Sequence, residues 1–193
     1  MAMLSRIQID RLGFASVGEN VQISEKASIY GAEYIEIGNN VRIDDFCVLA
    51  AGLGGIQIGN YVHIAVGSTL IGSKNIKLND FSGLSSRVSI YSSSDDYSGL
   101  TMTNPTVPDT YKNIYSAAVY LGRHVIVGSG SVILPGVRLE DGVAVGALSL
   151  ITKNCDYFGV YSGNPARRIK ERKRDLLELE MRMMLDMKNF SLS

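Results

Sequence analysis

The stretch Leu121-Gly-Arg-His-Val-Ile-Val-Gly-Ser-Gly-Ser-Val-Ile-Leu-Pro-Gly-Val-Arg-Leu139 carries a large aliphatic side chain at every sixth position, at Leu121, Val127, Ile133 and Leu139. An α-helix would repeat every 3.6 residues, and a strand of ordinary length would alternate every two. A period of six fits neither pattern. It predicts short strands joined by corners, with three six-residue sides in each coil.

The same period runs through most of the chain. Two residues before each aliphatic position, the side chain is usually small or branched, as at Val62, Ser68 and Ser131. Side chains alternate along a strand, so positions two apart both point inward. Stacked coils would lie about 4.8 Å apart, which is the ordinary distance between strands. The sequence therefore predicts an all-β fold, a parallel β-helix of about six three-sided coils, from these triplets: Val17, Ile23, Ile29; Ile37, Ile43, Leu49; Ile58, Ile64, Leu70; Leu78, Leu84, Ile90; Leu121, Val127, Ile133; Leu139, Val145, Ile151.

Glycine often follows the aliphatic residue that opens a coil, at Gly18, Gly38, Gly59 and Gly122. Glycine adopts tight corner conformations that β-branched residues resist. These positions are therefore expected to be corners that need the conformational freedom of glycine. A flexible linker would not keep a period of six over so many residues.

Composition excludes several function classes. The 193 residues include 19 basic and 19 acidic side chains, so no net charge draws the chain to nucleic acid or to an anionic membrane. No window has the roughly 18 apolar residues of a membrane span, and the N-terminus has no apolar stretch typical of a signal peptide. Cys47 and Cys155 are expected to be buried packing residues. Together these features predict a cytoplasmic protein.

Three segments follow from where the period begins and ends. Residues 1–16 are expected to cap one end, residues 17–166 to form the β-helix, and residues 167–193 to form a helical tail. Within the β-helix, residues 91–118 lack the period and include Asn104-Pro-Thr-Val-Pro, which predicts a projecting polar loop. From about Arg167 to Lys188 the chain reads as a helix, with an apolar stripe at Leu176, Leu179, Met183 and Met187 that is expected to serve packing.

Three motifs in the second half resemble a known family. They are the stretch from Gly122 to Val137, the block Ala144-Val-Gly-Ala-Leu-Ser-Leu-Ile-Thr-Lys, and the exit segment Tyr161-Ser-Gly-Asn-Pro-Ala-Arg. Together they resemble the hexapeptide-repeat acyltransferases, in particular the galactoside, maltose and xenobiotic O-acetyltransferase group. The resemblance covers roughly residues 17–152 and implies a left-handed β-helix. The segment Asn104-Pro-Thr-Val-Pro further resembles a loop segment of enzymes that modify surface-polysaccharide sugars or nucleotide sugars, such as those of lipopolysaccharide biosynthesis.

The resemblance also implies partners and binding residues. It implies a homotrimer with active sites between neighbouring subunits, acetyl-CoA as the acyl donor without a metal, and a carbohydrate acceptor. Ser129 and Ala147 would line the pantetheine arm of the coenzyme through backbone groups. Cationic and hydroxyl side chains suit its phosphates, and the nucleotide end would be contacted by Thr152, Lys153, Arg167 and Lys170.

The resemblance does not identify the catalytic base as directly as it does the binding residues. Acyl transfer needs a base for the acceptor proton and a donor for the developing oxyanion. In the family the base is a loop histidine, but here Tyr91-Ser-Ser-Ser-Asp-Asp places Asp95 at that position. By alternation His63 points outward, and we expect it to act as base or thioester contact, with Asp95 or Asp96 orienting it. The reverse assignment, with Asp95 as base, stays open; Asp96 and Tyr91 are expected to contact the sugar.

Other interpretations remain. The second histidine, His124, is read as a corner residue. A zinc enzyme on this fold would need three histidines between subunits, and the chain has 2 in all. A non-catalytic trimeric binding or scaffold protein is the main alternative function. Whether the acceptor atom is oxygen or nitrogen is left undecided by the sequence.

Overall fold

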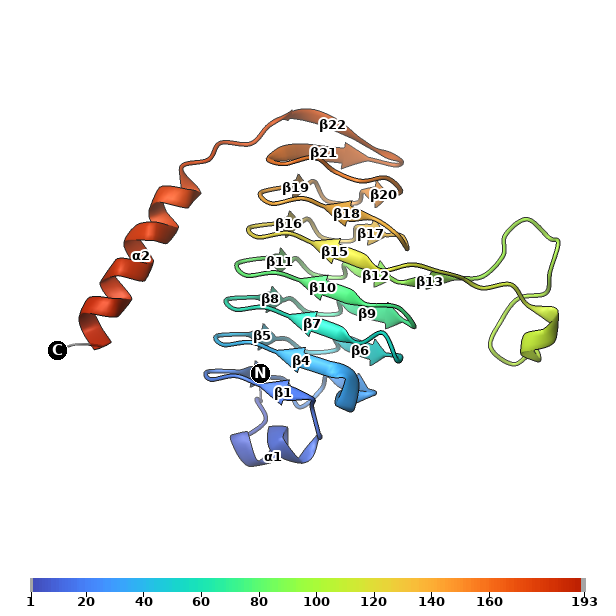
Figure 1. The fold of residues 1–193 in the computed structure, drawn as a ribbon, viewed down its shortest axis with the longest axis horizontal. Coiled ribbons are helices and arrows are strands. Elements are labelled where there is room, and N and C mark those ends of the chain that lie inside the picture. Colours follow the sequence, from blue (N-terminus) through green and yellow to red (C-terminus); the bar gives the residue numbers. More distant parts are fainter. Residues whose placement is uncertain (1, 192–193) are drawn as a thin grey trace.

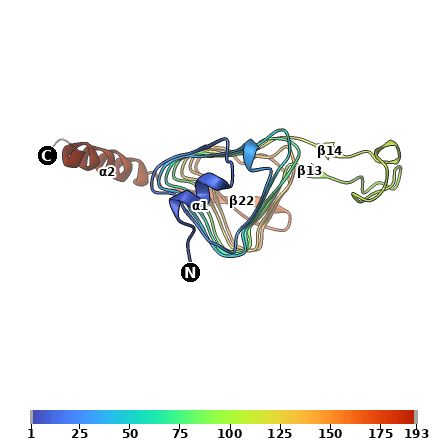
Figure 2. The same cartoon turned by 90° about the horizontal axis from the view of Figure 1, so that it is seen from below.

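The computed structural model describes residues 2–191, which form a three-sided prism of stacked coils with a projecting loop and a C-terminal helix beside the prism (Figure 1). Figure 2 shows the triangular cross-section, with the loop and the helix leaving from different corners. The predicted parallel β-helix is confirmed. Among residues 2–191, no helix is long and apolar enough to cross a membrane.

Each side of the prism is one sheet, and we call these face 1, face 2 and face 3 in chain order. Face 1 stacks six parallel strands: β1 (Ser16–Val17), β4 (Ile35–Ile37), β7 (Ile56–Ile58), β10 (Ile76–Leu78), β15 (Val119–Leu121) and β18 (Arg138–Leu139).

Face 2 is the longest sheet and has eight strands. Its parallel strands are β2 (Gln22–Ile23), β5 (Arg42–Ile43), β8 (His63–Ile64), β11 (Gly83–Leu84), β16 (Ile126–Val127), β19 (Ala144–Val145) and β21 (Gly159–Gly163). Face 3 has six: β3 (Ser28–Tyr30), β6 (Val48–Ala51), β9 (Thr69–Gly72), β12 (Ser89–Tyr91), β17 (Val132–Ile133) and β20 (Leu150–Ile151). The expected count of about six coils is therefore close, and β21 adds one side of a further coil.

The core is the single column of side chains inside the prism. The aliphatic positions of the middle coils, such as Ile64, Leu84 and Val127, are almost completely buried, and so are the small residues two positions earlier. Each buried aliphatic side chain stabilises the fold by about 1.5–3 kcal/mol relative to an exposed one. In the first coil Val17 and Ile29 are only partly buried, because no further coil lies beneath them.

The N-terminal segment covers this open end. Helix α1 (Arg6–Arg11) begins with a capping box in which Ser5 and Gln8 bond to each other's backbone. It lies beneath the first coil in Figure 1 and buries Ile9 against the core cluster. A short 3₁₀ turn, η1 (Ala32–Tyr34), follows in the first corner insertion.

The glycines that open the coils are needed for a different reason from the one expected. Their backbone does not lie in the left-handed region; instead a Cβ on Gly59 or Gly122 would come within 2.8 Å of backbone atoms in the next coil. The left-handed conformation falls two residues later, for example at Tyr61 and His124. The expectation of corner freedom at Gly18, Gly38, Gly59 and Gly122 was therefore wrong: close stacking of the coils demands glycine there.

The loop is inserted without disturbing the stack. Strand β10 pairs directly with β15 across it, in the same register that β10 keeps with β7. A two-stranded stalk, β13 (Ser93–Ser94) with β14 (Tyr115–Ser116), carries the loop outward, and a 3₁₀ turn η2 (Asp109–Tyr111) lies near its far end (Figure 1).

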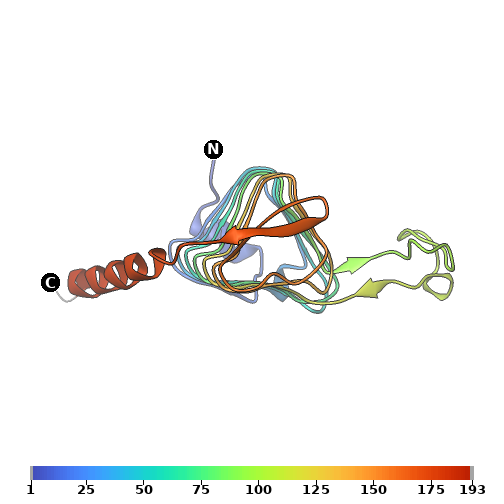
Figure 3. The same cartoon turned by 90° about the horizontal axis from the view of Figure 1, so that it is seen from above.

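The C-terminal tail differs from its prediction. Residues expected to start a helix at about Arg167 instead form strand β22 (Ala166–Glu171), which pairs antiparallel with β21. Figure 3 shows β22 crossing the far end of the prism. Helix α2 begins only at Leu176 and runs to Ser191. Residue 1 of the expected cap and residues 192–193 of the expected tail lie outside the described residues.

Candidate active site

His63 stands on the outer surface of face 2. Strand β8 buries Ile64 and exposes His63, as the alternation predicts. In the sheet, His63 is in register with Arg42 of the preceding coil and with Gly83 of the following one. Its imidazole thus lies in a column of outward-facing positions that runs along the prism.

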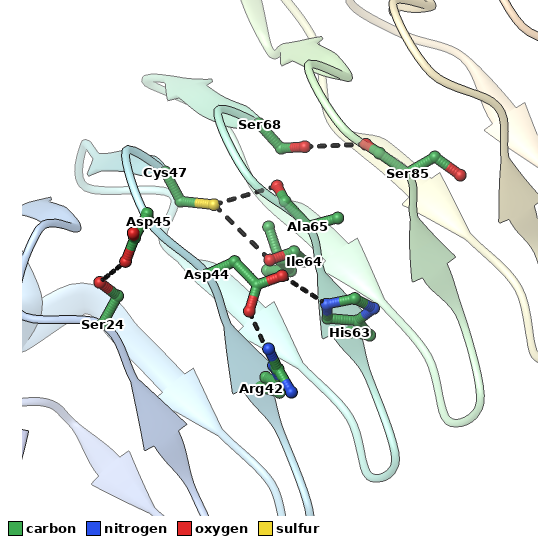
Figure 4. Close-up of polar contacts among 10 residues, drawn as sticks. All are labelled: Ser24, Arg42, Asp44, Asp45, Cys47, His63, Ile64, Ala65, Ser68 and Ser85. Carbon is green, nitrogen blue, oxygen red and sulfur yellow. Dashed lines mark hydrogen bonds and ion pairs between the residues drawn. The ribbon is translucent and has the colours of Figure 1, made fainter. Parts of the chain in front are cut away.

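A buried carboxylate holds this imidazole. Asp44 is 7% exposed, and its Oδ2 lies 2.9 Å from His63 Nε2, while its Oδ1 accepts from Arg42 Nε at 2.7 Å (Figure 4). Burial favours the neutral acid, but the hydrogen bonds and charges of Arg42 and His63 outweigh it and hold the pKa of Asp44 below its ordinary value.

The tautomer of His63 follows from this contact. An ionised carboxylate only accepts hydrogen bonds, so Nε2 carries the proton that it donates to Asp44. The basic lone pair of the neutral ring is then on Nδ1. A carboxylate that fixes the tautomer and orientation of an imidazole is a common arrangement for general base catalysis.

A hollow of about 360 Å³ opens beside the ring. It is lined by His63, Ala65, Gly83, Leu84, Ser85, Ser86, Ile126 and Ser129, all from face 2 or from the corner that follows it. The hollow combines an imidazole, hydroxyl groups and apolar side chains. It therefore has a base, hydrogen-bonding groups and an apolar surface within one space.

Ser129 and Ala147 lie on successive coils at this same corner. The backbone N–H of Leu148 donates to the carbonyl oxygen of Ser129 at 2.9 Å. A Cβ on Gly128 would come within 2.4 Å of the backbone nitrogen of Ala147, so the coils stack here without room for larger residues. Ser129 lines the hollow of His63, whereas Ala147 lies exposed one coil further along.

The predicted nucleotide-end residues gather at the far end of the prism. Thr152, Lys153 and Arg167 line one hollow of about 350 Å³, together with Arg168 and Asp156. Lys170 does not line it; it stands opposite Val160 in the pairing of β22 with β21. Three of the four predicted residues are thus brought together, with one further arginine that the sequence did not single out.

The acidic pair on the loop is engaged locally. Asp96 accepts from the backbone of Ser98 and from the backbone and hydroxyl of Thr101. Hydrogen bonding by the side chain and backbone of Ser98, and then by Thr101, lowers the pKa of Asp96 to about 2. Asp95 accepts a longer bond, 3.4 Å, from the backbone of Asn104 and borders two hollows of the loop. Tyr91 ends β12, at the base of the stalk, in register with Ile71.

Within this chain, neither Asp95 nor Asp96 orients His63, because Asp44 does. Asp44 and Arg42 were missed from the sequence, although a signal existed. The coil period aligns Arg42-Ile43-Asp44 with His63-Ile64-Ala65, one coil later. Arg42 shares the register of His63, and Asp44 lies two residues further along on the same side of that coil.

The cysteines and the second histidine have structural surroundings. Cys47 and Cys155 are free and buried, and burial raises the pKa of both, that of Cys155 to about 12. His124 lies at a corner, stacked on Phe81. These positions agree with the packing and corner roles expected for them.

Comparison with known proteins shows which family the chain belongs to. No family model matches the chain. It is 56% identical over 180 residues to dTDP-4-amino-4,6-dideoxy-D-glucose acyltransferase of Escherichia coli, covering 93% of this chain and 94% of the relative. The chain belongs to the hexapeptide-repeat sugar acyltransferases.

Solved structures support this membership. AntD, an N-acyltransferase from Bacillus cereus in complex with dTDP and 3-hydroxybutyryl-CoA, is 45% identical, with a TM-score of 0.91 over 96% of this chain and 98% of AntD. A variant of AntD in complex with dTDP-4-amino-4,6-dideoxyglucose and coenzyme A is 44% identical, with a TM-score of 0.92 over 95% of this chain and 97% of that one.

The predicted activity is therefore confirmed: this sugar acyltransferase uses a coenzyme A thioester as donor and a carbohydrate as acceptor. No finding favours the alternative of a non-catalytic scaffold. The roles of the individual site residues stay predictions.

Proposed function

We propose that the chain transfers an acyl group from acyl-CoA to the 4-amino group of a dTDP-4-amino-4,6-dideoxy sugar. The observation that carries the chemistry is the Asp44–His63 pair at the edge of the hollow on face 2. The acceptor is supported by the name of the Escherichia coli relative and by the sugar nucleotide bound in the AntD variant. Both favour nitrogen over oxygen as the acceptor atom.

The coenzyme is proposed to run along the corner between face 2 and face 3. Its phosphates would lie near Thr152, Lys153, Arg167 and Lys170, where cations and hydroxyl groups suit anionic oxygens. The pantetheine arm would pass Ala147 and Ser129. Its thioester would then reach the hollow beside His63, since Ser129 lies on the proposed path of the pantetheine arm and also lines this hollow.

In the proposed reaction, the neutral amine of the sugar attacks the thioester carbonyl carbon. The new C–N bond forms, the C–S bond breaks, and the nitrogen gives up one proton to Nδ1 of His63. The departing thiolate takes that proton from the imidazolium and leaves as coenzyme A, which returns His63 to its neutral form. Asp44 stabilises the imidazolium that forms in between, as carboxylates paired to catalytic histidines do.

We also propose a homotrimer in which the loop of one subunit reaches the face 2 hollow of its neighbour. The loop leaves the prism from another corner than the one that borders this hollow, on a stalk that holds it away from its own chain (Figures 1 and 2). Asp95, Asp96 and Tyr91 would then contribute to the acceptor site between subunits. Asp95 remains the alternative base in this arrangement.

The test compares His63→Ala and Asp95→Ala with the wild-type protein. Release of coenzyme A thiol is measured with acetyl-CoA and dTDP-4-amino-4,6-dideoxyglucose. We expect His63→Ala to lower kcat by about 10²- to 10⁴-fold, the usual contribution of a general base, and Asp95→Ala to raise KM for the sugar more than it lowers kcat.

His124→Asn serves as a matched control, since Asn tolerates the left-handed backbone of that corner and the residue lies outside the hollow. Near wild-type kcat in His63→Ala would contradict the assignment of the base. Transfer to hydroxyl sugars but not to the amino sugar would contradict the proposed acceptor.

A further inference from the structure

Gly83 occupies an unusual place on face 2. It is the outward residue of β11, in register with His63 of the preceding coil and with Ile126 of the following one. Its two direct neighbours in this column, His63 and Ile126, carry side chains of at least four heavy atoms. At Gly83 the column is interrupted, directly beside the imidazole.

Nothing in the fold of the described residues requires glycine there. The backbone of Gly83 is not in the left-handed region, and an added Cβ would meet no atom within 4 Å. Gly59 differs, because a Cβ there would collide with the next coil, and so does Gly99, which has a positive φ. Glycine within a strand costs conformational entropy and contributes no packing. A space is thus kept open where a side chain would stabilise the strand.

This space belongs to the hollow beside His63. Adjacent strands lie about 4.8 Å apart, so a group attached to a carbonyl carbon next to His63 would extend over Gly83 toward Ile126. Ile126 is 46% exposed and presents an apolar surface to the hollow, which Ala65 also borders. The surface suits a short aliphatic chain.

We propose that Gly83 determines the size of the acyl group, by leaving room over β11 for carbon atoms beyond the acetyl methyl. This inference rests on the proposed function, and it names the donor class as short acyl thioesters of about four carbons. Ser85 and Ser129 border the same hollow, so a hydroxyl group on such a chain would find hydrogen-bonding partners there.

The experiment measures kcat/KM for acetyl-CoA, butyryl-CoA and 3-hydroxybutyryl-CoA with one acceptor, dTDP-4-amino-4,6-dideoxyglucose. Gly83→Ala and Gly83→Val are compared with the wild-type protein. A misfit of one methylene group in an apolar pocket changes kcat/KM by about 10- to 200-fold. We expect Gly83→Val to lose at least about 10-fold for the four-carbon donors relative to acetyl-CoA, and Gly83→Ala to lose less.

Ser16→Val is the matched control, because it adds the same kind of side chain at an outward position of face 1, away from the hollow. Thermal unfolding checks that each variant folds; if Gly83→Val does not fold, Gly83→Ala decides. An equal loss for all three donors would overturn the inference, because the space would then hold another part of the substrates. It would also be overturned if the donor ratio does not change, or if the wild-type protein accepts acetyl-CoA alone. Absence of transfer to the amino sugar from any donor would instead refute the proposed function.

Discussion

At the scale of single residues, Asp44 has opposing influences on its charge. Burial disfavours the carboxylate, whereas Arg42 and His63 favour it, and the net effect is a pKa below its ordinary value. A carboxylate that remains charged in a buried place must keep its partners, since an unpaired buried charge is costly. Asp44 therefore fixes both the ring orientation of His63 and the atom that carries its proton.

Asp44→Asn should separate these effects. The amide can still bond to the ring but has no charge to stabilise an imidazolium, so we expect kcat to fall about 10-fold, a part of what a general base contributes. KM for both substrates should change little, because Asp44 lies behind His63 rather than in the hollow. A rise in KM as large as the fall in kcat would speak against a positioning role for Asp44.

The same variant predicts a change in stability with pH. A carboxylate with a lowered folded-state pKa contributes stability that is present above its ordinary value of 3.8 and is lost as pH falls through the folded-state pKa. The difference in unfolding free energy between wild type and Asp44→Asn should thus be steady at neutral pH and shrink below about pH 4. Denaturant titrations measure it, with Asp10→Asn on the exposed face of α1 as the control for loss of one charge.

At the scale of elements, helix α2 is attached to the prism at one corner. Glu180 pairs with both Arg123 and His124, its Oε2 lying 2.6 Å from His124 Nε2. His124 in turn stacks on Phe81, with ring centroids 5.0 Å apart, and Phe81 stacks on Tyr61. The ring stack follows the same corner through successive coils. Helix α2 is therefore attached, through Glu180 and His124, to a stack of rings that the coil repeat places one above another.

Glu180→Gln should loosen this attachment. The substitution removes the charge that pairs with Arg123 and His124, and we expect faster tryptic cleavage at Arg182 and Lys188 in α2, with the prism left intact. Glu178→Gln is the control, because Glu178 is exposed and its ion pair is with Arg182 of the same helix. Mass spectrometry of the early fragments reports the rate. Equal rates in the two variants would show that Glu180 does not hold the helix.

The elements also show which features the sequence could predict. The period of six located core residues correctly in every coil, with only Val17 and Ile29 of the first coil partly buried, because a narrow prism must bury the side chains at these positions. It could not separate β22 from the helix that follows. Arg167-Arg168-Ile169-Lys170 suits a helix by propensity, but its pairing with β21 decides its conformation. The composition of a short segment does not show which strand it will pair with in the folded chain.

The candidate site divides in the same way. His63 was found from alternation, and Ser129, Ala147, Thr152, Lys153 and Arg167 from the resemblance of their motifs. Asp44 required knowledge of which coils touch, and that depends on the lengths of the corner insertions. The place of Asp95 relative to His63 depends on how subunits meet, which a single chain does not contain.

At the scale of the whole molecule, the proposed trimer makes the active site a shared property of two subunits. If Asp95 and His63 act from different chains, a mixture of His63→Ala and Asp95→Ala subunits contains some interfaces with both residues native. Refolding or co-expressing the two variants should then restore roughly a quarter to a third of wild-type activity at sugar concentrations below the KM of Asp95→Ala, where each variant alone stays low.

The molar mass from light scattering provides the accompanying measurement and should equal three chains. Activity of the mixture no greater than the mean of the two variants would argue for a site within one chain. A monomeric mass would exclude the shared site altogether.

The regular stack of face 2 has a consequence for how such an enzyme can change its donor. On the proposed path of coenzyme A, strands β11, β16 and β19 follow β8 toward the nucleotide end, and β19 lies three strand spacings, roughly 14 Å, from the strand of His63. The fold can lengthen or shorten this separation only by whole coils. The distance between the base and the nucleotide end can therefore change only in discrete steps of one coil. Fine adjustment to a donor must come from single side chains along the prism.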